Sequence, residues 1–167
     1  AVAPIAPAPR TTMSRIAERA DDAFDHRGWM AELSDLRMTD TDDPDTSITD
    51  AMTQATARAV AELGIGTILC ISGSGFTVRS MARFRPAARI IGLSSNERTV
   101  GQLTLSWGTE PIHLPEEGDL DDRVNAALKV ACKRGAVTPG ELVGVLAGTD
   151  VRSRSTNALR IERVPEA

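Results

Sequence analysis

The sequence predicts a three-layer α/β/α sandwich around a sheet of buried parallel strands. Short apolar runs such as 66–71 (GTILCI) and 142–147 (LVGVLA) are typical of such strands, and they alternate with longer amphipathic segments typical of helices. Aromatic residues make up only 3% of the 167 residues, so Ala, Val, Ile and Leu must fill the core. A chain of this length is sufficient for one domain with a substantial core.

The first part of the chain is expected to lead into the main domain. Residues 1–10 alternate Ala and Pro, a composition that favours an extended or disordered leader. Residues 11–38 are expected to be helical, because apolar residues recur at helical spacing after a threonine cap, with Gly28 breaking the helix in two. Residues 39–46 (TDTDDPDT) indicate an acidic linker, so the main domain is assigned to 39–167.

The main domain opens with a helix. Ser47 and Asp50 have the spacing of a capping box, and Gly64 is the expected stop. The stripe expected to be buried on this helix comprises Ile48, Ala51, Met52, Ala55, Ala59 and Leu63. Apolar periodicity and turn residues then predict, in order, a strand at 66–71, a helix at 76–84, a strand at 89–93, a helix at 96–107, a strand at 111–114, a helix at 119–134, and strands at 142–147 and 157–164.

Charge and hydropathy exclude two classes of partner. The formal net charge of −4 argues against nonspecific binding to nucleic acid. No apolar run approaches the roughly 20 residues that a membrane-spanning helix needs, and no signal peptide opens the chain. Between residues 65 and 115, five arginines outnumber two acids, which suits a small anionic ligand, although ordinary solvated helix surface is the simpler explanation.

The cysteines and histidines indicate no metal site. Cys70 and Cys132 each lie in an apolar segment, so we expect buried free thiols, as in a reducing cytoplasm. His26 and His113 are isolated from each other and from the cysteines, whereas a metal site needs several ligands at short spacing.

The loop after the first predicted strand is the most informative feature. A glycine-rich turn between a buried strand and a helix can aim backbone N–H groups at one point, and the helix N-terminus adds partial positive charge. Hydroxyl groups in the loop can add hydrogen bonds. This pattern predicts a phosphate or carboxylate site, and a simple tight turn without a ligand is an equally good interpretation of the local pattern. The residues concerned are Ser72, Gly73, Ser74, Gly75, Phe76 and Thr77.

Three better-known motifs do not fit this loop. A P-loop needs Gly-Lys-Ser/Thr at the helix start, and no lysine is present. The dinucleotide fingerprint needs a third glycine at Val78 and an acid after the second strand, where the chain has Ser94. A nucleophile elbow needs serine at Gly75.

Several longer motifs follow in order. They are SGSGFT at 72–77, FRP at 84–86, RIIGLS at 89–94, WG at 107–108, DDRVN at 121–125 and TNALRI at 156–161. Together with TMSRIAERADDAFDHRGWM at 12–30, they resemble the C-terminal α/β domain of the pyruvate kinase family. That family carries a T-x-S-G-x-[ST] loop, a Y-R-P turn, a D-x-R-V-N helix and a terminal T-N-x-[LM]-R strand. The resemblance covers nearly the whole chain from Thr12.

The resemblance implies a five-stranded, mostly parallel sheet in the order 3-2-1-4-5, with the last strand antiparallel. It implies that residues 11–38 continue from the end of a catalytic barrel. The parent enzyme would use Mg²⁺ and K⁺ to transfer phosphate from phosphoenolpyruvate to ADP in glycolysis. Phosphoenolpyruvate, metal and nucleotide would bind in the barrel and its lid, so this chain should contain no catalytic residue and no cofactor of its own.

The resemblance also implies a regulatory role. In the family this domain binds a phosphorylated allosteric effector and forms an interface of a homotetramer. The effector residues would be the loop at 72–77, with Arg123, Arg152, Arg154 and Ser155 as further contacts. Arg152 and Arg154 stand where sugar-bisphosphate-regulated members have glycine. This departure leaves the effector open between a sugar phosphate and AMP.

We therefore weigh three hypotheses. The first is a regulatory domain of a cytoplasmic pyruvate kinase, either cut from it or encoded separately. The second is a stand-alone oligomerisation or binding module in which the loop binds nothing. The third is a small independent enzyme, which no acid, base or nucleophile pattern supports.

Overall fold

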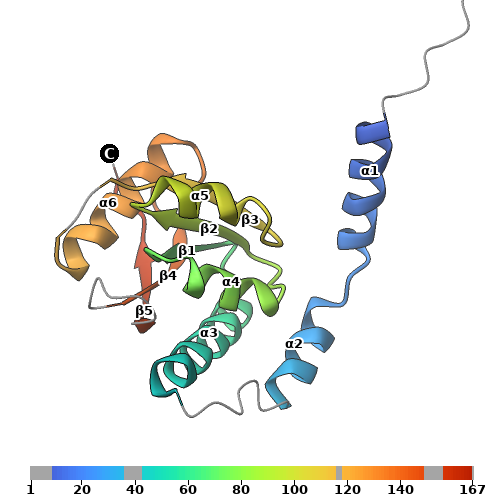
Figure 1. Cartoon of the computed structure of the whole chain (residues 1–167), viewed down its shortest axis with the longest axis horizontal. Helices are drawn as coiled ribbons and strands as arrows, with labels where there is room; N and C mark the ends of the chain where they lie inside the picture. The colour runs from blue at the N-terminus through green and yellow to red at the C-terminus, as the bar shows by residue number, and fades with distance from the viewer. Residues whose placement is uncertain (1–8, 36–42, 116–117, 149–155, 167) are drawn as a thin grey trace, which may run out of the picture.

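A five-stranded sheet forms the centre of the molecule, with helices on both faces (Figure 1). The computed structural model describes residues 9–35, 43–115, 118–148 and 156–166. The strands are β1 (Thr67–Ile71), β2 (Arg89–Ser94), β3 (Thr109–His113), β4 (Leu142–Gly148) and β5 (Thr156–Arg163). The helices are α1 (Pro9–Asp22), α2 (His26–Asp35), α3 (Pro44–Leu63), α4 (Phe76–Arg83), α5 (Glu97–Leu103) and α6 (Leu120–Lys133).

The sheet has the order β3-β2-β1-β4-β5, as the family resemblance implied. β1 pairs in parallel with β2 and β4, and β2 pairs in parallel with β3. β5 is antiparallel to β4 and forms an edge. The predicted three-layer α/β/α class and the antiparallel last strand are therefore confirmed.

Two apolar clusters fill the layers above and below the sheet. One lies between the sheet and α6 and includes Val124 and Leu128. The other lies between the sheet and helices α3, α4 and α5, and includes Val60, Met81 and Leu103. Within the described ranges, no helix is long and apolar enough to cross a lipid bilayer.

Helix α3 differs from its prediction at its start. It begins at Pro44, not Ser47, because Asp43 takes the N-cap position and Pro44 has a backbone suited to the first turn. The expected capping box is wrong, since Asp50 lies inside the helix and forms an ion pair with Arg83. The predicted stop is confirmed, because Gly64 has a left-handed backbone with φ 65°.

The buried stripe of α3 is also different from the expected one. Ile48 and Leu63 are 45% and 56% exposed, whereas threonines face the core. The hydroxyl of Thr53 donates to the Thr49 carbonyl and that of Thr56 to the Met52 carbonyl. Because the helix itself accepts these hydroxyl protons, Thr53 and Thr56 can be buried at little cost, whereas the buried Thr49 hydroxyl has no partner among the described residues. The fully buried positions of α3 are Thr49, Asp50, Thr53, Thr56, Ala57 and Val60.

The break between α1 and α2 falls before Gly28, not at it. Residues 23–25 separate the helices, and Gly28 lies in the first turn of α2, where its N–H donates to the Asp25 carboxylate at 2.9 Å. A Cβ at position 28 would collide with that carboxylate. Glycine therefore allows a close helix cap here, and the prediction of a helix breaker is wrong.

Helix α5 is shorter than predicted. Asn96 caps it as expected, accepting from the backbone N–H groups of Arg98 and Thr99. The helix ends at Leu103, so Trp107 lies in the turn before β3 and is not part of a helical stripe.

Candidate functional site

The glycine-rich loop lies at the carboxyl end of β1, the central strand. The chain leaves β1 for β2 on one side, whereas β4 pairs with β1 on the other side. Ligands of open α/β sheets bind at such a reversal of strand order. The loop therefore stands where a ligand site is expected from topology alone.

The loop turns sharply into α4 at Gly75. Gly75 has φ 72°, and a Cβ there would lie 2.9 Å from Arg79 Nη1 and 3.0 Å from Thr99 Cγ2. Only glycine fits both the backbone angle and the space. The turn brings the N-terminus of α4 to this point of the loop, and the N-terminus of a helix favours negative charge.

The peptide between Gly73 and Ser74 is held from the protein side. The Gly73 carbonyl accepts hydrogen bonds from the hydroxyls of Ser94 and Thr99, at 3.2 and 2.9 Å. In a trans peptide the following N–H points away from the carbonyl. The Ser74 N–H is therefore directed away from the body of the protein, as an anion site requires.

The serine hydroxyls of the loop remain half-buried. Ser74 Oγ accepts a long hydrogen bond of 3.4 Å from the Phe76 N–H, which leaves its own proton available for donation. The Ser72 N–H donates to the Leu93 carbonyl, which fixes the start of the loop to β2. Phe76 is half-buried on the first turn of α4.

Thr77 is buried under the loop and has a hydrogen-bond partner. Its side chain is 3% exposed, and its hydroxyl bonds to the hydroxyl of Thr156, the first residue of β5. Sequence reasoning missed Thr156, because the contact joins residues that are far apart in the chain. Thr156 does belong to the TNALRI motif of the terminal strand, which was used only to recognise the family resemblance.

The Arg123 side chain is buried and donates hydrogen bonds to two backbone carbonyl groups. It is 8% exposed, its Nη2 donates to the Gly148 carbonyl at 2.7 Å, and its Nε donates to the Asp119 carbonyl at 3.3 Å. Asp119 and Asp122 form a capping box at the start of α6. Arg123 thus fixes the carboxyl end of β4, next to the end of β1.

The other predicted contacts, Arg152, Arg154 and Ser155, lie outside the described residues. The two residues that flank them are described and are paired across the sheet, Gly148 with Thr156. Arg123 holds the first of these and Thr77 the second. Gly148 and Thr156 thus both lie at the end of the sheet that carries the glycine-rich loop.

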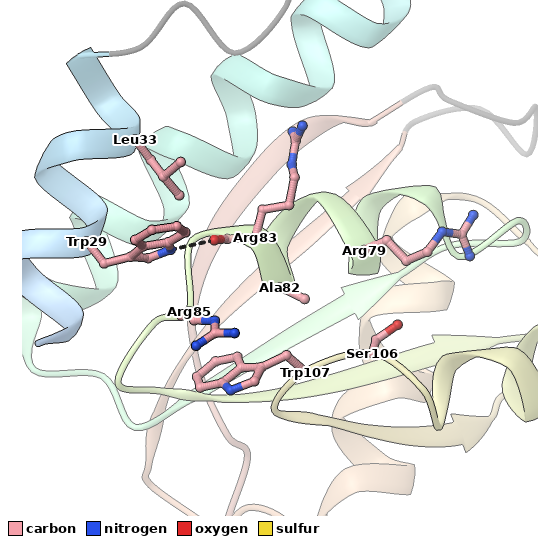
Figure 2. A pocket seen from close by; sticks show the side chains of 8 residues that line it. All are labelled: Trp29, Leu33, Arg79, Ala82, Arg83, Arg85, Ser106 and Trp107. Carbon is pink, nitrogen blue, oxygen red and sulfur yellow. Dashed lines mark hydrogen bonds between the residues drawn. The ribbon is translucent and has the colours of Figure 1, made fainter. Parts of the chain in front are cut away.

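A second concave surface lies along α4, between α2 and the turn that precedes β3. We call it the aromatic basin; it has a volume of about 460 Å³. Its lining consists of Trp29, Leu33, Arg79, Ala82, Arg83, Arg85, Ser106 and Trp107. Figure 2 shows the Arg85 side chain over Trp107, and the guanidinium groups of Arg79 and Arg83 pointing away from it.

The contacts of the aromatic basin attach α2 to the body. Trp29 Nε1 donates to the Arg83 carbonyl at 2.8 Å, and His26 Nδ1 lies 2.7 Å from the Arg85 carbonyl (Figure 2 shows the first). The Arg85 guanidinium lies 5.0 Å from the Phe24 ring centre and 5.5 Å from that of Trp107. Cation–π contacts of this kind stabilise a fold.

The local excess of arginine is therefore largely structural. Arg83 pairs with Asp50, and Arg89 donates to the Ala136 carbonyl and lies 3.8 Å from Glu110. Arg79 donates to the Ser74 carbonyl at 3.2 Å, which makes it the arginine of this group that contacts the loop.

The described side chains do not fit a metal centre or a reactive thiol. Nowhere in the described ranges do three His, Cys, Asp or Glu side chains gather. Both cysteines are free, but only Cys70 is buried as expected, because Cys132 is half-buried. Burial raises the pKa of Cys70 to about 12, which keeps its thiol protonated and unreactive.

These features define a small three-layer α/β domain with a glycine-rich strand-to-helix loop at its topological switch point. Residues 50–162 match the family described as "Pyruvate kinase, alpha/beta domain". The chain belongs to this family.

Similar proteins are pyruvate kinases of bacteria. The chain is 32% identical to the pyruvate kinase of Geobacillus stearothermophilus over 156 residues, covering 93% of this chain and 25% of that protein. It is 29% identical to that of Clostridium acetobutylicum, over 92% of this chain and 31% of that protein. It is 33% identical to that of Methylorubrum extorquens, over 90% of this chain and 30% of that protein. The chain thus spans a quarter to a third of the length of these relatives.

Proposed function

We propose that this chain is the regulatory domain of a cytoplasmic pyruvate kinase and that it binds a phosphorylated effector at residues 72–77. The observation that carries the proposal is the loop itself. It turns the Ser74 N–H outward, places the N-terminus of α4 at the switch point, and adds half-buried serine hydroxyls. The effector is a sugar phosphate or AMP.

A thermal-shift titration tests this proposal. We expect inorganic phosphate, glucose 6-phosphate, fructose 1,6-bisphosphate or AMP to raise the Tm of the chain, and sodium chloride at matched ionic strength to leave it unchanged. A ligand at 100 times its Kd stabilises the folded state by about 2.7 kcal/mol. The absence of a shift with every phosphorylated compound would refute the effector site.

We propose that phosphoryl transfer from phosphoenolpyruvate to ADP takes place in the parts of the longer pyruvate kinases that this chain does not match. The absence of any metal-ligand cluster from the described residues supports this division. The purified chain should form no pyruvate from phosphoenolpyruvate and ADP, with Mg²⁺ and K⁺ present. Measurable turnover would contradict it.

We also propose a role in homo-oligomer formation, which the membership of the chain in the pyruvate kinase family supports. Ile48 and Leu63 are 45% and 56% exposed on α3, but they lie about four helical turns apart and do not form a contiguous apolar patch. Light scattering over a range of concentrations tests this role, and a strict monomer would count against it for this chain.

A further inference from the structure

A β-bulge lies at the point where β5 begins. Ala147 pairs with Ala158, but the next residue of β4, Gly148, pairs with Thr156, so Asn157 is an extra residue in β5. Side chains alternate between the two faces of a strand, and a bulge shifts that alternation by one residue.

The bulge decides where the Thr156 side chain lies. Leu159 packs against the cluster on the α3 and α4 face of the sheet, whereas Arg160 pairs with Asp121 of α6 on the other face. Strict alternation from Leu159 would place Thr156 on the α6 face. The extra residue brings Thr156 to the α4 face, where its hydroxyl meets that of Thr77.

Among the described residues, one proton of the hydroxyl pair has no acceptor. Each threonine hydroxyl can donate one hydrogen bond and accept two. One hydroxyl donates to the other, and no further acceptor contacts either oxygen in the part of the chain that the structure describes. Both side chains are almost fully buried, Thr77 at 3% and Thr156 at 2% exposure, and an unused buried donor is unfavourable.

We infer that Thr156 is a positioning residue of the effector site and acts through Thr77. In the bound state the Thr156 hydroxyl donates to Thr77 Oγ1, and the Thr77 hydroxyl donates its proton to an oxygen of the bound phosphate. This inference rests on the proposed function, since it needs an anion at the loop. It names a residue that the loop motif does not contain.

The position of Thr77 supports this direction of the hydrogen bonds. Thr77 is the second residue of α4, on the turn whose N–H groups face the expected anion. An anion beside Thr77 favours the arrangement in which Thr77 donates to it, so the Thr156 proton must point to Thr77. Hydrogen bonds in such a chain polarise and strengthen one another.

A double-mutant cycle on the full chain tests the inference. The variants are Thr77→Val, Thr156→Val, the double variant and Thr156→Ser, with Kd for inorganic phosphate and glucose 6-phosphate measured by calorimetry well below each Tm. Valine keeps the shape of threonine and removes the hydroxyl. Thr53→Val is the matched control, because Thr53 is also a buried threonine but bonds only to carbonyls of its own helix.

We expect Thr77→Val to weaken binding about tenfold, in line with a hydrogen bond to a charged group. Thr156→Val should weaken it about three- to tenfold, and the double variant should bind no more weakly than Thr77→Val alone, because Thr156 acts only through Thr77. Thr156→Ser should restore the affinity of the unmodified chain. Thr53→Val should lower Tm without changing Kd.

Other results overturn the inference in different ways. If Thr156→Val lowers Tm but leaves Kd unchanged, Thr156 has only a structural role. If the two valine effects add in the double variant, the two residues do not form a relay. If the unmodified chain binds neither of these compounds, nor fructose 1,6-bisphosphate or AMP, the proposed effector site itself fails, and the inference fails with it.

Discussion

The carboxyl ends and the amino ends of the parallel strands, here called the carboxyl edge and the amino edge, carry different kinds of side chain. At the carboxyl edge, the loop after β1 offers backbone N–H groups and small hydroxyl side chains, and Gly75 fits only because it has no side chain. At the amino edge, the aromatic basin is built from large side chains, and Phe24, Trp29 and Trp107 gather around Arg85. The first edge leaves donors for a ligand, whereas the second uses its donors to hold α2.

This difference explains why an excess of arginine is a poor guide to an anion site. In this chain Arg85 stacks on aromatic rings, Arg83 pairs with Asp50, and Arg79 donates to the Ser74 carbonyl, while the candidate anion site consists mostly of backbone. In the loop of the candidate anion site, the Gly73 carbonyl points inward. It is held there by hydrogen bonds from the hydroxyls of Ser94 in β2 and Thr99 in α5.

The largest effect should come from filling the space at Gly75. Gly75→Val should destabilise the chain by about 2–4 kcal/mol and abolish phosphate binding, because the residue would combine a left-handed backbone with overpacking. Urea unfolding and the phosphate titration measure both effects. The matched control is Gly73→Ala, since a Cβ at Gly73 meets nothing within 4 Å, and a comparable loss there would contradict the steric reason.

Removal of the Arg123 guanidinium should have the next largest effect. Arg123→Met leaves the Gly148 carbonyl without its partner, and we expect a loss of about 1–3 kcal/mol of stability and weaker phosphate binding. Arg134→Met, at the exposed end of the same helix, should be nearly neutral. Equal effects of the two substitutions would show that the hydrogen bond from Arg123 to Gly148 does not stabilise the carboxyl end of β4.

Substitutions in the aromatic basin should change the stability of the chain without changing phosphate binding at the loop. Trp29→Phe removes the donor to the Arg83 carbonyl and should cost about 1 kcal/mol of stability, with no change in phosphate affinity. The chain has only two tryptophans, and both line the aromatic basin. Their fluorescence therefore reports this edge alone, and we expect it to stay constant while phosphate binds. A change during the titration would mean that the two edges are coupled.

The smallest effect concerns acid stability at the start of β4. Partial burial raises the pKa of Glu141, but hydrogen bonds from Thr138 and Thr67, with the charge of Arg89, outweigh it and lower the pKa below its usual value. A lowered pKa in the folded state adds stability above the unfolded value of about 4.3, and that stability is lost as the pH falls through the folded value.

Glu141→Gln should thus be less stable than the unmodified chain at neutral pH, by about 1 kcal/mol or less. The difference should shrink as the pH falls below about 4, because the carboxylate of the unmodified chain then becomes protonated. Unfolding curves at several pH values measure this, and a difference independent of pH would contradict the assignment. Glu166→Gln, near the chain end and exposed, is the control.

The sequence predicted β1, β2 and β4 well because these strands are short apolar runs that are buried on both faces. The order of the five strands was predicted from the family resemblance. The sequence predicted the loop at 72–77 as well, since glycine and serine spacing is a local property. The buried face of α3 was predicted wrongly, because this alanine-rich helix has two stripes of similar hydrophobicity. Threonines that bond to their own helix, such as Thr53 and Thr56, decide which one is buried.

The features that the sequence did not predict depend on contacts that no local pattern indicates. Gly28 looks like a helix breaker until the carboxylate of Asp25 is seen to occupy the space beside it. Thr156 joins Thr77 only because a bulge shifts one strand by one residue, and no local pattern marks that bulge.

The pairing of Gly148 with Thr156 has a consequence for how such domains can diversify. The segment 149–155 starts and ends at fixed points, so its replacement by a longer or shorter one leaves the sheet intact. The entropy of closing a loop grows slowly, by about 0.6 kcal/mol for each doubling of its length. If the proposed function is correct, exchange of this segment beside the unchanged loop at 72–77 would change the effector without a change of fold.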